Sequence, residues 1–299
     1  MSEHGTPETG DGGTVLATIL TFDAPEAVTR CLERLEDQDR RPDEVLVVDN
    51  AGDRPAAPAV EGRTWAFPVR LVRTTANLGP AGGHALALER FLASPHDWVW
   101  ILDDDIRADP GALTALLDVG RRHHPALVEP RIRDDATGEE VRRHGWWGVV
   151  LPRAVVADVG LPDARLFWWT EDTEYLQWRI PNAGYPAVRT DEVVAAISRR
   201  RSSAAKPGWK YYYEARNQVH HRLRVQRPPD PDDVPRHLTR RVRVWRAGRS
   251  VTKLAVRSVV RERDGRAGKL WMVVRGTGDG LRGRLGITVV PDRSHRPDA

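Results

Sequence analysis

Three consecutive aspartates, Asp103–Asp105, come directly after the apolar run Trp98–Leu102. This run is short and rich in aromatic and β-branched residues, which predicts a buried β-strand. Adjacent carboxylates repel one another unless a cation or hydrogen-bond donors neutralise them. Side chains alternate along an extended chain, so Asp103 and Asp105 are expected to share one face and Asp104 the other. Their oxygens suit Mg²⁺ or Mn²⁺ bound with a diphosphate; the alternative is a solvated acidic turn that caps the next helix.

Two other predicted strands, Val15–Thr21 and Glu44–Val48, also end in polar residues. The first leads into Asp23, which is expected to cap the helix that follows it. The second leads into Asp49-Asn50. The carboxylate of Asp49 could recognise the base or ribose of a nucleotide, although Asp-Asn is also common in plain turns.

The elements that must position these residues are strands that alternate with helices. A further strand is expected at Val69–Arg73 and a helix over residues 85–92. Such alternation predicts a parallel sheet with right-handed crossovers. Ligands bind such sheets beyond the carboxyl ends of the strands. The polar strand ends are therefore expected to meet at one crevice.

A glycine-rich segment, Asn77–Gly83, precedes the helix over residues 85–92. Glycines let the backbone approach a ligand closely, and the start of a helix favours phosphate. The spacing is neither that of a P-loop nor that of a dinucleotide-binding fingerprint. A phosphate contact and a plain tight turn both remain open.

The segment Trp168–Tyr175 joins aromatic residues to carboxylates. Aromatic faces pack against the C–H faces of sugars, and a partly desolvated carboxylate can act as a general base. The alternative is the start of an amphipathic helix, where the helix dipole favours acidic residues.

A later aromatic stretch contains Tyr212, Arg216 and Asn217. The guanidinium of Arg216 could lie near a phosphate, or it could serve as a structural ion-pair partner.

Taken together and in this order, these segments resemble the family-2 glycosyltransferases of the GT-A fold, in particular bacterial galactofuranosyl- and rhamnosyltransferases. The resemblance covers about residues 14–225. It is carried by Thr21-Phe22-Asp23, Val47–Gly52, Asn77–Gly83, Trp100–Pro110, His144–Gly148, Gly160–Tyr175, Ala183–Tyr185 and Tyr211–Asn217.

The resemblance implies an α/β fold with a mostly parallel central sheet flanked by helices. Beyond the part that it covers, the basic and amphipathic sequence after residue 226 predicts a mainly helical C-terminal extension. The resemblance also implies an inverting transfer of a sugar from a nucleoside-diphosphate donor to a glycan, lipid-linked or small-molecule hydroxyl, with Mn²⁺ or Mg²⁺ as cofactor. Asp172 would be the catalytic base, and Asp103 and Asp105 would hold the metal. The expected donor-binding residues are Thr21, Asp23, Asp49, Asn77, Gly79, Gly82 and Asp104, and the expected acceptor-binding residues are Trp146, Trp147, Trp168, Trp169 and Glu171.

One departure from the family pattern concerns a metal-binding histidine that often follows the Ala183–Tyr185 segment. Here Ile197 and Ser198 stand where it is expected. Either the metal has fewer protein ligands, or His220 or His221 takes its place.

Composition limits the class of protein further. The only cysteine, Cys31, excludes an intramolecular disulfide and a zinc site built on cysteines. No run approaches the roughly 20 apolar residues that span a bilayer, and the polar N-terminus lacks the features of a signal peptide. We expect a cytoplasmic protein. The predicted parts are a disordered tail (1–13), a nucleotide-sugar half (14–130), an acceptor half (131–225) and a basic extension (226–299).

The net charge of +4 is unevenly distributed, because arginines cluster in the last third of the chain. They are Arg199, Arg200, Arg201, Arg240, Arg241, Arg243, Arg246, Arg249, Arg257 and Arg261, with Lys253 among them. This end could attract an anionic membrane at the inner face of the cell, or it could be a solvated helix face. Two rival functions are a metal-dependent nucleotidyltransferase and a non-catalytic binder of anionic lipid or nucleic acid; as a partner of the enzyme, nucleic acid is not expected.

Overall fold

The computed structural model describes residues 13–141, 145–197, 206–226 and 238–291. Residues 1–12, His144, Ser198, Arg199–Arg201 and the linker at 228–235 lie outside the described residues. The chain forms two compact units. The first comprises described residues of Met1–Asn77, Leu86–Leu161 and Ile180–Arg199, and the second those of Leu78–Ala85, Pro162–Arg179 and Arg200–Ala299.

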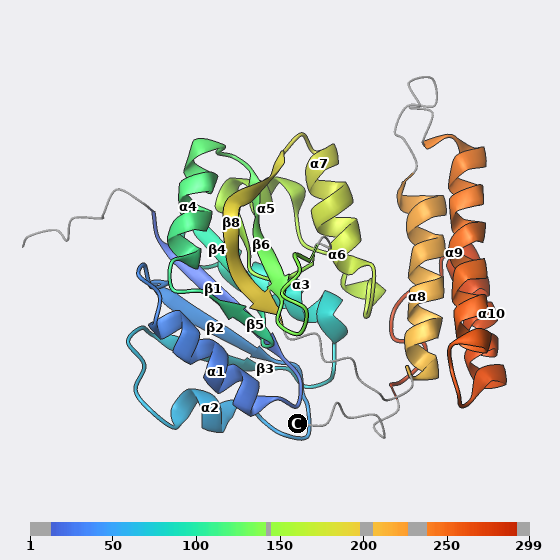
Figure 1. Ribbon diagram of the computed structural model, residues 1–299, viewed down its shortest axis with the longest axis horizontal. Coiled ribbons are helices and arrows are strands. Elements are labelled where there is room, and N and C mark those ends of the chain that lie inside the picture. The colour runs from blue at the N-terminus through green and yellow to red at the C-terminus, as the bar shows by residue number, and fades with distance from the viewer. Residues whose placement is uncertain (1–12, 142–144, 198–205, 227–237, 292–299) are drawn as a thin grey trace, which may run out of the picture. The chain divides into compact units, whose positions relative to one another are not determined.

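The first unit is built on an eight-stranded sheet with the order β3-β2-β1-β4-β7-β6-β8-β5 (Figure 1). Its first half is parallel and consists of β1 (Val15–Thr21), β2 (Glu44–Asp49), β3 (Val69–Arg73) and β4 (Trp98–Asp103). The strand residues of β1, β2 and β4 are almost all buried, because helices cover both faces of a parallel sheet. The four strands predicted from short apolar runs are confirmed.

The second half of the sheet is mixed. It contains β5 (Ile106–Ala108), β6 (Leu127–Asp134), β7 (Val149–Pro152) and β8 (Ala187–Ile197). β7 runs antiparallel to both β4 and β6, whereas β6 and β8 are parallel and β5 is antiparallel to β8.

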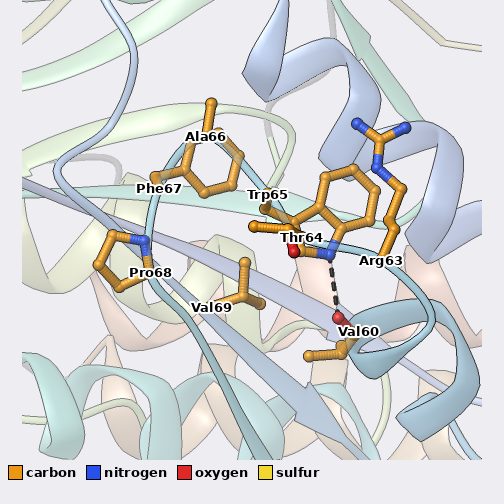
Figure 2. A pocket seen from close by; sticks show the side chains of 8 residues that line it. All are labelled: Val60, Arg63, Thr64, Trp65, Ala66, Phe67, Pro68 and Val69. Carbon is orange, nitrogen blue, oxygen red and sulfur yellow. Dashed lines mark hydrogen bonds between the residues drawn. The ribbon is translucent and has the colours of Figure 1, made fainter.

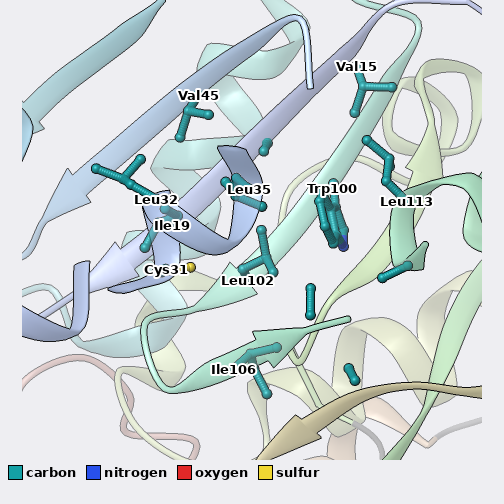
Figure 3. Close-up of a cluster of buried hydrophobic side chains, with 14 of the residues drawn as sticks. Val15, Ile19, Cys31, Leu32, Leu35, Val45, Trp100, Leu102, Ile106 and Leu113 are labelled. Carbon is teal, nitrogen blue, oxygen red and sulfur yellow. The ribbon is translucent and has the colours of Figure 1, made fainter. Parts of the chain in front are cut away.

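The helices of this unit come from the expected crossovers. They are α1 (Pro25–Glu36), α2 (Ala57–Glu61), the later part of α3 (Gly79–Leu92), α4 (Ala112–Arg122), α5 (Arg153–Val159) and the short α7 (Ile180–Asn182). The residues of α3 up to Ala85 belong to the second unit. Buried residues of α1, α2 and α4 form one cluster with alternate residues of the strands (Figure 3). The other strand residues, such as Leu16, Leu46 and Val99, are also buried, so both faces of the sheet are covered.

The predicted helix cap at Asp23 is wrong. Ala24 holds the cap position of α1 without a side-chain bond. The carboxylate of Asp23 instead accepts a hydrogen bond from the backbone N–H of Arg54, at 2.8 Å. The loop that contains Arg54 is distant in sequence, and it binds the carboxylate oxygen of Asp23 that the sequence pattern predicted to cap α1.

The second unit is helical in its C-terminal part. It contains η1 (Ala164–Leu166), α6 (Glu171–Glu174), η2 (Tyr175–Arg179), α8 (Gly208–His220), η3 (His221–Val225), α9 (Arg240–Val260) and α10 (Arg266–Arg282). Within the described parts of the chain, no helix is both long and apolar enough to cross a bilayer.

The core of the second unit is built on α8, whose three tyrosine hydroxyls are all bonded. Tyr211 donates to Glu262 at 2.8 Å, Tyr212 to Asp279 at 2.7 Å, and Tyr213 to the carbonyl of Val289 at 2.7 Å. The hydroxyls therefore tie α8 to the segments around it.

Candidate active site

The carboxyl ends of β1, β2 and β4 lie at one edge of the sheet. Thr21 is paired in register with Asp49 of β2, and Leu20 with Asp103 of β4. The hydroxyl of Thr21 donates to Oδ2 of Asp104 at 2.5 Å. The structure thus brings together the polar strand ends that the sequence singled out within this unit.

The three aspartates do not alternate as an extended strand would. β4 ends at Asp103, and Asp104 and Asp105 form a turn before β5. The alternation expected of an extended chain therefore applies only up to Asp103, because the strand ends there. The turn directs Asp104 to β1, where Thr21 binds it.

Negative charge is concentrated at this turn. The pKa of Asp104 is raised to about 7, chiefly by burial and also by the charges of Asp105 and Asp103, against the lowering effect of the Thr21 hydrogen bond. The pKa of Asp105 is also raised to about 7, by removal from water and then by the charge of Asp103. Groups whose ionised form is disfavoured in this way gain from a bound cation, and their oxygens are the ligands that Mg²⁺ and Mn²⁺ prefer. The turn therefore fits a divalent cation, although no group of three or more Asp, Glu, His or Cys residues is assembled for a metal in the described residues.

Asp49 is buried at the end of β2 with half of its carboxylate in use. Its Oδ2 accepts from the backbone N–H of Ala56 at 2.9 Å and from Arg73 at 2.5 Å. Its Oδ1 is buried and has no hydrogen-bond partner among the described residues. An unsatisfied buried carboxylate oxygen is costly, so this atom is suited to accept a bond from a ligand.

Asp23 is positioned by the loop that follows β2. Its backbone lies in the left-handed region, at φ 57°. A Cβ added to Gly52 would lie 2.3 Å from Oδ1 of Asp23, so only glycine allows this close approach. Asn50 extends the network, because its side chain donates to Oδ1 of Asn77 at 3.2 Å.

The two glycines predicted to bind the donor have tight packing environments within the second unit. Gly79 has φ +66°, and a Cβ there would lie 2.1 Å from the carbonyl oxygen of Phe167. A Cβ on Gly82 would lie 2.6 Å from the Cβ of Leu78. Both positions have a packing reason for glycine, so contact with a phosphate remains a prediction.

The segment before Asp172 is strained. Phe167, Trp169 and Thr170 all have positive φ, at 61°, 72° and 78°. Each such residue costs on the order of 1–3 kcal/mol unless the surroundings hold it in place. Backbone strain of this kind clusters at functional sites.

The strained segment is held by two buried residues of α8. The side-chain amide of Asn217 donates to the carbonyls of Leu166, Trp168 and Trp169, at 2.8, 2.9 and 2.7 Å. Arg216 donates to the carbonyl of Leu166 at 2.8 Å and to Oδ1 of Asn217 at 2.8 Å. Both residues are fully buried.

The guanidinium of Arg216 thus contacts main-chain carbonyls, which differs from both roles considered for it. Its other donors reach the carbonyls of Arg165, at 3.2 Å, and Gly286, at 2.5 Å. From α8, Arg216 and Asn217 thus position the loop at 166–170 through its main-chain carbonyls.

The carboxylate of Asp172 is largely removed from water and is hydrogen-bonded to Thr173. Its Oδ1 accepts from the backbone N–H of Thr173 at 2.5 Å and from the Thr173 hydroxyl at 3.2 Å. Burial raises the pKa of Asp172, and the Thr173 bonds and the charge interaction with His84 oppose this shift.

Sequence reasoning missed His84, a fully buried residue of α3. Burial lowers its pKa to about 3, against the charge of Asp172, so the imidazole is neutral at physiological pH. The signal was present as a histidine directly after the glycine-rich segment, but that segment suggested backbone contacts only.

The predicted acceptor residues differ in exposure. Trp169 is 38% exposed and Glu171 is buried. Trp168 packs edge-on against Trp209 at 5.1 Å between ring centroids. In the first unit Trp146 is buried and Trp147 packs against the hydrophobic core. Of the four tryptophans, Trp169 offers the most open ring, and the acceptor role of all five residues remains a prediction.

His220 and His221, which were considered as replacements for the family's metal-binding histidine, lie in other surroundings. His221 is buried edge-on against Trp178, with 6.0 Å between ring centroids, and its Nε2 shares a hydrogen bond with Gln226 at 3.1 Å. Burial lowers the pKa of His220, and nearby arginines contribute to the same effect. Ile197 ends β8 as a buried core residue.

A surface hollow lies elsewhere on the first unit. It is lined by Val60 and by residues 63–69, which lead into the amino end of β3 (Figure 2). There the indole N–H of Trp65 donates to the carbonyl of Val60 at 3.0 Å, and Arg63 lies 4.1 Å from the centroid of the Trp65 ring. Since ligands of parallel sheets bind at carboxyl ends, this hollow is no candidate for the donor site.

The fold is of the GT-A type and is shared by solved structures, one of which is a mannosyltransferase. Staphylococcus aureus TarS has a TM-score of 0.58 at 15% identity, over 94% of this chain and 50% of that one. A mannosyltransferase from Pyrobaculum calidifontis, solved with GDP-Man and Mn²⁺, has a TM-score of 0.57 at 16% identity, over 93% and 90% of the two chains. At this identity the likeness concerns the fold alone.

Sequence comparison identifies the family. The family model described as glycosyl transferase family 2 matches residues 17–154. Galactofuranosyltransferase GlfT1 of Mycolicibacterium smegmatis is 33% identical over 58% of this chain and 67% of its own length. GlfT1 of Mycobacterium tuberculosis is 31% identical over 58% and 66%. The chain belongs to the family-2 glycosyltransferases, and the resemblance noted in its motifs is confirmed. It aligns with about two thirds of the length of these curated relatives and half of TarS.

Proposed function

We propose that this enzyme is an inverting glycosyltransferase that uses a nucleoside-diphosphate sugar and a divalent cation. The observation that carries the proposal is the shared edge of β1, β2 and β4, at which Thr21, Asp49 and the Asp103–Asp105 turn lie together. An edge of this kind combines a hydrogen-bond acceptor suited to a nucleoside, the Asp49 carboxylate, with a cluster of carboxylates suited to a cation.

The nucleoside is assigned to Asp49 and Asp23. Oδ1 of Asp49 is buried without a partner among the described residues, so an N–H or O–H of the base or ribose would satisfy it. Arg73 and the N–H of Ala56 fix the other oxygen and thereby orient the carboxylate. Asp23 is held by the loop after β2 through Arg54.

Asp103 and Asp105 are the residues assigned to Mn²⁺ or Mg²⁺, with Asp104 held away by Thr21. A bound cation would neutralise the charge on the departing diphosphate.

Asp172 is assigned as the general base. In a single displacement it takes the proton of the acceptor hydroxyl while that oxygen forms a bond to the anomeric carbon. The bond from this carbon to the diphosphate oxygen breaks, and its electron pair leaves with the nucleoside diphosphate. Attack from the side opposite the leaving group inverts the configuration. The raised pKa of Asp172 increases its basicity for this step.

Three residues would position the base without touching substrate. Arg216 and Asn217 hold the carbonyls of the strained segment, and neutral His84 lies within the electrostatic reach of Asp172. The stiff support favours catalysis because small misplacements of a reacting group lower the rate strongly.

The donor sugar and acceptor are proposed from the relatives. Because the GlfT1 proteins are named as galactofuranosyltransferases, UDP-galactofuranose is the first donor to test. A glycan or lipid-linked hydroxyl is the corresponding acceptor class.

The test is a thermal-shift panel of UDP-, dTDP- and GDP-sugars with Mn²⁺, followed by an assay of the product released. Release of a nucleoside diphosphate is expected, whereas release of pyrophosphate would indicate a nucleotidyltransferase and overturn the proposal. Asp49→Asn should weaken nucleotide binding about 10- to 100-fold, the range for a hydrogen bond to a charged group. Asp118→Asn, in an exposed ion pair with Arg121, is the matched control and should bind as the parent does.

A further inference from the structure

The C-terminal segment of the second unit, residues 238–291, has a larger net positive charge than the whole chain. It contains 14 Lys and Arg residues and 3 Asp and Glu residues, a net charge of +11, while the whole chain has +4. The rest of the chain is therefore acidic overall. Two of the three acidic residues are buried, with Glu262 bonded to Tyr211 and Asp279 to Tyr212. The exposed charge of this segment is almost purely positive.

The same segment carries exposed apolar side chains. Ten of the twelve large hydrophobic residues exposed in the described parts of the chain belong to it: Val244, Trp245, Val256, Val259, Val260, Trp271, Val274, Leu281, Ile287 and Val290. Single exposed apolar residues are normal on any protein, but such a concentration marks an interaction surface.

Helix α9, labelled in Figure 1, carries both the positive charge and the exposed apolar side chains. Its buried residues, Arg243, Ala247, Leu254 and Ser258, recur at helical spacing and face inward. At 100° per residue the opposite face carries Trp245, Val256, Val259 and Val260. Trp245 is 61% and Val260 70% exposed.

Basic residues lie both on this face and beside it. By the same helical spacing Arg241 and Arg249 share the face with the apolar residues. Arg249 lies one turn from Trp245, with its guanidinium 5.5 Å from the ring centroid. Lys253 and Arg257 are exposed along one flank. No acidic residue occurs anywhere in α9.

We propose that this face of α9 docks on an anionic lipid bilayer. An interfacial helix places an apolar stripe with tryptophan among the headgroups and acyl chains, while flanking Lys and Arg contact lipid phosphates. A nucleic acid would use the arginines but not the exposed valines. A second copy of the chain would bring two strongly basic segments together and meet charge repulsion. The proposal does not depend on the sugar-transfer chemistry.

The experiment is sedimentation of the full chain with phosphatidylcholine vesicles, with and without one third of phosphatidylglycerol. Binding to the anionic vesicles is expected, together with its loss at about 0.5 M NaCl, where exposed charges are screened. Absence of binding to anionic vesicles at low salt would overturn the proposal.

Variants separate the two components of the face. Arg249→Gln with Lys253→Gln should weaken vesicle binding about thirtyfold, since each basic residue contributes about 1 kcal/mol near an anionic surface. Trp245→Gln with Val256→Gln should weaken it at least about tenfold through lost apolar burial. Arg121→Gln with Arg122→Gln removes the same charge from exposed ion pairs on α4 and should leave binding unchanged.

Two results would replace the membrane by another partner. Binding of single-stranded DNA that exceeds vesicle binding and is insensitive to Trp245→Gln would indicate a nucleic-acid surface. A dimer in sedimentation velocity that Trp245→Gln dissociates would indicate self-association. Either result overturns the proposal. Sugar transfer to a soluble acceptor is measured in parallel and should persist in every α9 variant.

Discussion

Two regions assigned to chemistry in this enzyme are built on opposite principles. The strand-end aspartates of the first unit follow from regular strands, with Thr21 and Asp49 in ordinary parallel register. The segment at 166–172 has three residues at positive φ and depends on Arg216 and Asn217 for its shape. In the first region a side-chain change alters mainly charge and hydrogen bonding. In the second, a change at a distant supporting residue alters geometry.

The sharpest test of the second region is Asp172→Asn. Turnover should fall about 10²- to 10⁴-fold, the range for a general base. The isosteric amide keeps the fold, and donor binding should be unchanged because Asp172 is assigned to the acceptor hydroxyl and not to the donor. Rates of nucleoside diphosphate release and calorimetry with UDP and Mn²⁺ measure the two effects. Turnover at the parental rate would exclude Asp172 as the base.

The support of the segment is tested by Asn217→Ala. The carbonyls of Trp168 and Trp169 would lose this donor, whereas the carbonyl of Leu166 keeps its bond from Arg216. Each buried group left unsatisfied costs about 1–3 kcal/mol. We expect a fall of roughly 3 kcal/mol in the free energy of unfolding and at least a tenfold lower kcat, with donor KM little changed. Chemical denaturation and steady-state kinetics check this.

The neighbouring Gln218→Ala is the matched control for Asn217. Its side chain makes one long bond to Glu214, at 3.3 Å, so both stability and kcat should stay near those of the parent. Equal effects of the two variants would refute the specific role of Asn217.

A pair of glycine substitutions separates steric contact from backbone strain. Gly79→Ala introduces a Cβ against the Phe167 carbonyl, whereas Gly138→Ala meets nothing within 4 Å; both have positive φ, at +66° and +71°. Gly138→Ala should lower the stability by about 1 kcal/mol, and Gly79→Ala by more than that and with a loss of activity. Thermal unfolding of both proteins decides, and equal shifts would show that the close approach is unimportant.

Much of the donor side could be predicted from sequence because it follows local rules. Val15–Thr21 and Trp98–Leu102 are continuous apolar runs, since strands of a covered parallel sheet are buried on both faces. Their ends then identify Thr21 and Asp103 directly. The orientation of Asp104 could not be predicted in this way, because it depends on a turn and on Thr21, 83 residues away.

The support of Asp172 was beyond such rules for the same reason. Arg216 and Asn217 reach carbonyls about 50 residues earlier in the chain, and a carbonyl has no signature in sequence. Asp23 shows the competing principle plainly, because the local capping pattern lost to a bond from Arg54. The boundaries of the donor and acceptor halves remain predictions about binding.

The 166–170 segment is held through its main chain, which leaves its side chains free to differ between related enzymes. Asn217 donates hydrogen bonds to the main-chain carbonyls of Trp168 and Trp169 and makes none of these bonds to their indole rings. Substituting these two aromatic side chains would leave the hydrogen bonds from Asn217 in place. On the proposed acceptor role of Trp168 and Trp169, the side chains at these two positions can change with the sugar that is bound, while Arg216 and Asn217 keep the main chain in place.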